Sequence, residues 1–125
     1  MEGKVLYPIL DKAEAFALRI VKLYQYLVEK GERVMSKQVL RSGTSIGANL
    51  HEAQYAQSGR DFISKLEIAL KECYETEYWL SLLYETGYIS QDAYSPLQST
   101  CGTLRRMLIS SLTTAKRNRS LPSPP

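Results

Sequence analysis

The side chains that could carry out chemistry are few, and they form no recognised catalytic or metal-binding set. His51 is the only histidine, so two histidine ligands cannot meet, and Ala48 stands where a di-iron bundle motif needs glutamate. Ser42, Thr44 and Ser45 carry hydroxyls, but no histidine stands at a spacing typical of an activated nucleophile. We therefore expect no catalytic residue, no metal, no cofactor and no enzyme activity.

Glycines, cysteines and carboxylates also fit structural roles. Gly43 and Gly47 lie inside a helical pattern, whereas a phosphate-binding loop places its glycines at a strand-to-helix turn. Cys73 and Cys101 match no metal or redox spacing, and each falls at an apolar position, as buried cysteines do. The carboxylates of the third predicted helix indicate a solvated, partly paired surface rather than an acid–base pair: Glu67, Glu72, Glu75 and Glu77.

Basic side chains are the remaining candidates for function. The net charge is +3, but residues 88–125 hold five basic and one acidic side chain, a local net charge of +4. Such a segment suits contacts with phosphate, although it also occurs as a solubilising surface. The candidate nucleic-acid contacts are Arg41, Arg105, Arg106, Lys116, Arg117 and Arg119.

Four amphipathic segments must position these side chains. Apolar residues recur at spacings of three and four, which predicts helices over about 9–30, 36–57, 58–87 and 90–115. The predicted N-caps are Ser36, either Ser58 or Gly59, and Ser90, and Gly31 and Gly87 follow helix ends. With no strand signal, the pattern predicts an all-α, antiparallel up-and-down four-helix bundle over residues 1–115. Residues 116–125 are predicted to be a disordered, basic, proline-rich tail.

The second segment carries two glycines on or near its apolar stripe. Each glycine inside a helix costs about 1 kcal/mol relative to alanine, so Gly43 and Gly47 indicate a close approach of another backbone. That backbone belongs either to the same chain or to another subunit or a nucleic acid.

The third segment also has apolar residues on the side opposite its core stripe, which is predicted to consist of Phe62, Leu66, Ala69, Leu70, Cys73, Leu80 and Tyr84. Ile68, Trp79 and Leu82 fall there at helical spacing, which favours a protein contact and predicts self-association. Glu77 lies near the stripe itself. Either its aliphatic part packs on the core while the carboxylate stays in solvent, or the carboxylate forms a buried ion pair with Arg41.

The size and apolar content indicate one soluble domain. The chain has 125 residues, 44% of them hydrophobic, and no apolar run long enough to span a bilayer. The first four residues lack the apolar core of a signal peptide. We therefore expect a cytoplasmic location and no membrane partner.

Four long motifs resemble a known family, the four-helix-bundle proteins encoded in 23S ribosomal RNA intervening sequences. The resemblance extends from Phe16 to Lys116 and rests on FALRIV, SKQVLRSGTSIGAN, DFISKLEIALKE and ETEYWL, at residues 16–21, 36–49, 61–72 and 75–80. It implies a bacterial, cytosolic, ring-like homopentamer. A distant relative is the accessory variability determinant of diversity-generating retroelements, a pentameric bundle that binds nucleic acid and a reverse transcriptase through a basic surface.

Together, the residues and the resemblance favour a non-enzymatic homo-oligomeric adaptor. It would bind RNA or DNA weakly through charge, using the six basic residues named above. The alternative is a scaffold that recognises only protein.

Overall fold

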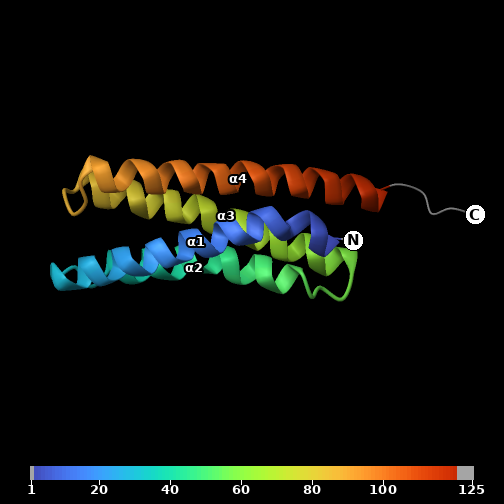
Figure 1. The fold of residues 1–125 in the computed structure, drawn as a ribbon, viewed down its shortest axis with the longest axis horizontal. Helices are drawn as coiled ribbons and strands as arrows, with labels where there is room; N and C mark the ends of the chain where they lie inside the picture. The colour runs from blue at the N-terminus through green and yellow to red at the C-terminus, as the bar shows by residue number, and fades with distance from the viewer. Residues whose placement is uncertain (1, 121–125) are drawn as a thin grey trace, which may run out of the picture.

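The computed structural model describes residues 2–120, which form four helices in a bundle. They are α1 (Glu2–Glu29), α2 (Met35–Ala53), α3 (Gly59–Glu85) and α4 (Gln91–Ser120), and the described residues contain no strand. Figure 1 shows the helices side by side along the long axis, running in alternating directions, with the start of α1 and the end of α4 at the same end of the bundle. The predicted all-α up-and-down four-helix bundle is confirmed.

The helices pack in the order in which they follow one another in the chain. The close pairs are α1 with α2, α2 with α3 and α3 with α4, while α1 and α4 approach each other much less extensively. None of the described helices is both long and apolar enough to cross a membrane.

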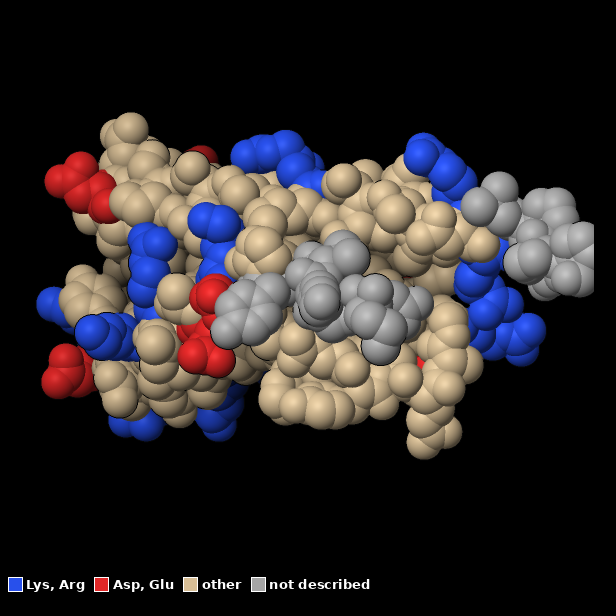
Figure 2. Space-filling view, turned by 45° about the vertical axis from the view of Figure 1, so that its right-hand side comes forward, with Lys and Arg blue, Asp and Glu red and all other residues tan. Residues whose placement is uncertain are grey.

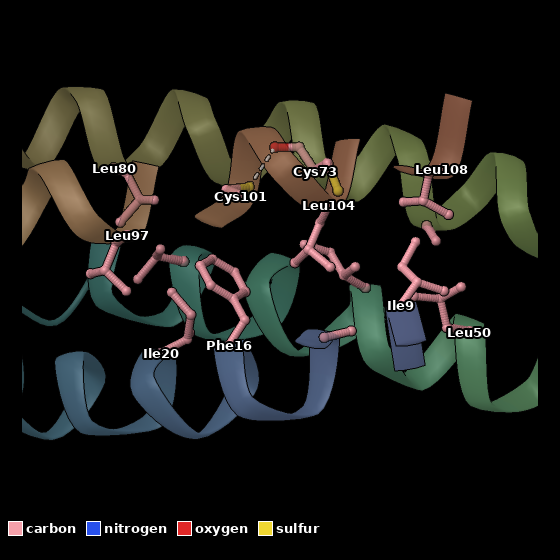
Figure 3. Close-up of a cluster of buried hydrophobic side chains, with 14 of the residues drawn as sticks. Ile9, Phe16, Ile20, Leu50, Cys73, Leu80, Leu97, Cys101, Leu104 and Leu108 are labelled. Carbon is pink, nitrogen blue, oxygen red and sulfur yellow. Dashed lines mark hydrogen bonds between the residues drawn. The ribbon is translucent and has the colours of Figure 1, made fainter. Parts of the chain in front are cut away.

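One hydrophobic core runs along the bundle axis. Leu, Ile and Phe side chains from all four helices fill it, and many of them are completely inaccessible to solvent. Figure 3 shows Phe16 and Ile20 of α1 directed toward Leu97 and Leu104 of α4, with Leu80 of α3 nearby. Because the core takes one stripe from each helix, each opposite face remains on the surface.

The core stripe of α3 follows a stricter period than the one predicted. Its buried positions are spaced alternately by four and three residues, and they include Thr76 and Leu83, which the sequence prediction omitted. Thr76 is tolerated there because its hydroxyl donates to the Glu72 carbonyl (2.7 Å) and lies 2.9 Å from the Ser42 hydroxyl of α2. Tyr84, predicted in the stripe, is only half-buried.

The first residues of α2 are capped by Glu32 and not by Ser36 as predicted. The Glu32 carboxylate accepts hydrogen bonds from the main-chain N–H groups of Val34 (3.3 Å), Met35 (3.1 Å) and Ser36 (2.6 Å). Ser36 itself lies inside the helix with its side chain buried. Burial alone would raise the pKa of Glu32, but the three main-chain hydrogen bonds outweigh it and lower that pKa.

The other predicted caps agree with the structure. The Ser58 hydroxyl accepts from the Asp61 N–H (3.1 Å) and the Ser90 hydroxyl from the Ala93 N–H (3.2 Å). Gly31 and Gly87, just beyond α1 and α3, have positive φ angles of 87° and 84°, which glycine adopts without strain.

Three helix ends differ from the predicted ones. α1 begins at Glu2 rather than near residue 9 and includes Pro8, whereas α2 ends at Ala53, before the predicted residue 57. α4 continues to Ser120, so residues 116–120 extend the helix beyond the boundary predicted at 115. Residues 121–125, the rest of the predicted tail, lie outside the described residues.

Candidate nucleic-acid interface

The predicted basic contacts lie on two helices. Arg41 is on α2, and the other five are on α4, whose single acidic residue is Asp92. α4 therefore carries a net charge of +4, while the whole chain carries +3. Figure 2 shows lysine and arginine side chains along the edge that α4 forms and around its C-terminal end.

Arg41 pairs with carboxylates, although not with the one predicted. Its guanidinium binds Glu72 (3.4 Å) and Glu75 of α3, and the Arg41 side chain is 48% exposed. Ser45 donates to the same Glu72 (3.3 Å), and the Trp79 indole N–H donates to Glu75 (3.0 Å). Arg41 is thus part of a polar network between α2 and α3 that neutralises its charge.

Glu77 pairs with Arg105 of α4 instead. The Arg105 Nε lies 3.0 Å from Glu77 Oε1, and both side chains are about three-quarters buried, at 27% and 20% exposed. The hydrogen bond to Glu77 raises the pKa of Arg105 above its ordinary value. The guanidinium also lies 5.8 Å from the centre of the Tyr74 ring, a cation–π distance.

The remaining basic residues of α4 differ in their neighbours. Lys116 pairs with Glu67 of α3 at 2.9 Å, and both are about half exposed. Arg106 donates to the Thr103 hydroxyl (3.2 Å), and the Arg119 side chain lies against Gly59 at the start of α3. Within residues 2–120, no carboxylate pairs with Arg106 or Arg119.

Between the arginines of α4 lies a shallow depression at Gly102. It has a volume of about 330 Å³, and mostly polar side chains line it. These come from α4 apart from Glu77: Tyr94, Ser95, Gln98, Ser99, Arg105 and Arg106. We call this depression the Gly102 notch.

The predicted self-association residues of α3 are less exposed than their pattern suggests. Ile68 is 38% exposed, Leu82 is half-buried, and Trp79 is half-buried against the core with its indole N–H held by Glu75. Tyr74 and Tyr78, one turn apart on α3, are more exposed at 52% and 56%. Helical spacing alone does not show that this edge of α3 is the more exposed one.

The two glycines of α2 face α1 of the same chain. A Cβ at Gly43 would lie 2.8 Å from Ile20 Cγ2, whereas a Cβ at Gly47 would lie no closer than 3.6 Å to Ala13. Gly43 is therefore a tight contact and Gly47 an ordinary one.

The groups capable of chemistry do not converge. The His51 ring packs edge-on against Tyr55, and the described residues contain no group of His, Cys, Asp or Glu side chains able to hold a metal. Cys73 and Cys101 are buried, free thiols, and Figure 3 shows the Cys101 thiol directed at the Cys73 carbonyl, at 3.5 Å. A hydrogen bond with Cys73 and burial raise the pKa of the Cys101 thiol, so it stays protonated and a poor nucleophile.

Comparisons with known proteins identify the family of the chain. Residues 7–110 match the family model of the 23S rRNA-intervening sequence protein. A crystal structure of a protein of unknown function from the S23 ribosomal protein family of Bacteroides thetaiotaomicron is 55% identical, with a TM-score of 0.82. That match covers 83% of this chain and 97% of the other. Among curated proteins no significant match was found. The chain therefore belongs to the 23S rRNA-intervening sequence protein family.

Proposed function

We propose that this protein is a non-enzymatic, homo-oligomeric adaptor of the cytoplasm that binds nucleic acid weakly through the charge of α4. The observation that carries the proposal is the concentration of positive charge on one helix: five basic residues against one acidic residue. A positive surface favours phosphate contacts, because each contact releases counterions condensed on the nucleic acid and this release drives binding.

The ion pairs separate five of the six candidate residues into two groups. Arg41, Arg105 and Lys116 are held by carboxylates of α3, so part of their charge is already neutralised. Arg106 and Arg119, which pair with no carboxylate within residues 2–120, supply exposed positive charge on α4. Affinity at physiological salt should therefore resemble non-specific binding, with Kd on the order of 1–100 μM.

Hydroxyl groups on the outer side of α4 add to this surface. Ser95, Ser99 and Thr103 precede Arg105, and Ser110 and Thr113 lie between Arg106 and Arg117. Serine and threonine commonly donate to phosphate oxygens. No acidic residue follows Asp92 in α4, so the helix itself adds no carboxylate near its arginines.

The test is a salt series with a charge-matched control. Binding of the wild type to a short single-stranded RNA and to a DNA duplex is measured by fluorescence anisotropy, and native mass is measured in parallel. The double variant Arg106→Ala/Arg119→Ala should weaken binding about tenfold and reduce the slope of log K against log salt by about 1.4 for the single strand. The control, Arg33→Ala/Lys37→Ala, removes two exposed charges outside α4 and should change affinity less than about twofold.

Two results would count against the proposal. Equal losses in the two double variants would mean that net charge, rather than α4, governs binding. Negligible binding of the intact wild-type protein at low salt would leave the protein-only scaffold. That alternative is supported by exposed apolar side chains such as Leu18 of α1, which is 64% exposed.

A further inference from the structure

Gly102 is buried although it lies on the outer part of α4, next to exposed Arg106. The reason is that two guanidinium groups extend over it. A Cβ at position 102 would lie 3.4 Å from Arg106 Nη1 and 3.5 Å from Arg105 Nη2. The missing side chain thus leaves a small space beneath two groups of N–H donors.

The two arginines are held differently. Glu77 accepts from the Arg105 Nε (3.0 Å), which fixes the guanidinium and leaves both Nη groups for other acceptors. Among the described residues, Arg106 is anchored only by the neutral Thr103 hydroxyl. The notch therefore has one pre-positioned arginine and one that can adjust, which is a suitable arrangement for an oxyanion.

The net charge around the notch matches that of a phosphodiester. Two guanidinium groups and the Glu77 carboxylate leave a net charge of +1. An internal phosphodiester carries one negative charge and would be neutralised, whereas a phosphate monoester near pH 7 carries more negative charge than the notch can balance. The hydroxyls of Ser95 and Ser99 offer further donors at the rim.

An aromatic side chain lies beside the notch. Arg105 stands 5.8 Å from the Tyr74 ring centre, and Tyr74 is 52% exposed, so ring surface remains open to a ligand. Stacking of a nucleobase on tyrosine requires a base that is not stacked within a duplex. A phosphate site adjoining such a ring fits a single strand better than a double helix.

We propose that the Gly102 notch binds one internal phosphodiester of a single-stranded nucleic acid, while an adjacent base stacks on Tyr74. The inference rests on the proposed function and specifies its ligand. The residues that act are Arg105 and Arg106 on the phosphate and Tyr74 on the base, and Glu77 positions Arg105.

The experiment uses two substitutions that leave the net charge unchanged. Gly102→Ala fills the notch floor, and because its Cβ meets nothing closer than 3.4 Å, the helix should keep its fold. Tyr74→Ala removes the stacking surface. Gly47→Ala is the matched glycine control, and Tyr55→Ala, in the α2–α3 connection, is the matched exposed tyrosine.

The probe is a labelled single-stranded RNA about 12 nucleotides long, compared with a duplex DNA of the same sequence. Gly102→Ala and Tyr74→Ala should each weaken single-strand binding about tenfold and duplex binding less than about twofold. The two controls should leave both affinities within about twofold of wild type. Inorganic phosphate at matched ionic strength should compete poorly, because the notch is suited to a diester.

The outcomes separate this inference from the proposed function. If wild-type protein binds both polymers and neither Gly102→Ala nor Tyr74→Ala changes single-strand affinity, the notch is not the site, while charge-driven binding by α4 stands. If millimolar phosphate displaces the RNA, the notch binds a free anion and the diester assignment is wrong. If the wild type binds neither polymer, both proposals fail together.

Discussion

At the scale of single residues, Glu32 shows how one carboxylate organises a helix start. It satisfies three main-chain N–H groups that would otherwise have no partner in the first turn of α2. The negative charge also lies at the positive end of the helix dipole, which adds to the same effect.

Replacing this carboxylate should lower stability in a pH-dependent way. Glu32→Gln should reduce the free energy of unfolding by about 1 kcal/mol at neutral pH, a typical loss for a helix cap. Since folding lowers the pKa of Glu32, its contribution is complete above the unfolded value of about 4.3 and is lost as pH falls through the folded pKa. Urea unfolding at several pH values measures this.

The wild type and Glu32→Gln should therefore converge in stability as pH falls from about 4.3 through the folded pKa of Glu32. A constant difference between them from neutral to acid pH would show that the charge of Glu32 does not contribute to capping.

The sequence identified the basic residues but not their partners. The pairing of Arg105 with Glu77, and of Arg41 with Glu72 and Glu75, depends on how far each helix is rotated about its own axis. Helical spacing gives only the approximate direction in which a side chain points. Because neighbouring turns of α3 carry several carboxylates, that direction does not identify which of them each arginine meets. Ser36 was favoured as a cap because serine is common there, while Glu32 acts from two residues before the N-cap.

At the scale of the helix, the contact between α1 and α2 depends on one glycine more than on the other. A Cβ at Gly43 would overlap the stiff, fully buried Ile20 side chain at 2.8 Å and 2.9 Å. At Gly47 the nearest atom is the Ala13 carbonyl oxygen at 3.6 Å, which is ordinary contact.

The two glycine-to-alanine variants should consequently change stability in opposite directions. Gly47→Ala should stabilise by about 0.5–1 kcal/mol because alanine favours the helix. Gly43→Ala should destabilise by about 1 kcal/mol, since overpacking of about 1–3 kcal/mol exceeds the same helical gain. Thermal and urea unfolding at one fixed protein concentration compare them, and stabilisation of both variants would contradict the tight contact at Gly43.

Much of each helix could be predicted from hydrophobic periodicity. The number of helices, the caps at Ser58 and Ser90 and most core positions follow from residue types and spacing. Thr76 was missed because a polar residue enters the core only when a partner such as Ser42 is close, and that proximity is tertiary. The extension of α4 to Ser120 was missed because its last turn has no apolar stripe.

At the scale of the whole molecule, the exposed edge of α3 remains the predicted contact between subunits. Trp79 is a poor site for testing it, because its indole N–H binds Glu75 and its ring packs on the core. Ile68 is exposed and is free of those contacts.

Ile68→Glu should reduce the native mass of the protein to that of a folded monomer. A carboxylate at the centre of an apolar subunit contact is desolvated without a partner, which disfavours association. Light scattering after size exclusion gives the mass, and circular dichroism checks the fold. Leu18→Glu on α1 is the control, being exposed but outside the predicted contact.

An unchanged mass for Ile68→Glu would exclude Ile68 from the interface. A wild-type protein that is already monomeric would refute homo-oligomerisation itself.

The order of helix packing also bears on how the chain reaches its structure. Every extensive helix pair consists of elements adjacent in sequence, and only the sparse α1–α4 contact joins the two ends. Native partners are therefore close in sequence, which keeps the contact order and the entropic cost of loop closure low. Helical bundles with low contact order fold in microseconds to milliseconds. During translation, each hairpin can therefore assemble once its second helix has left the ribosome, and α4, the basic helix, is the last to become available.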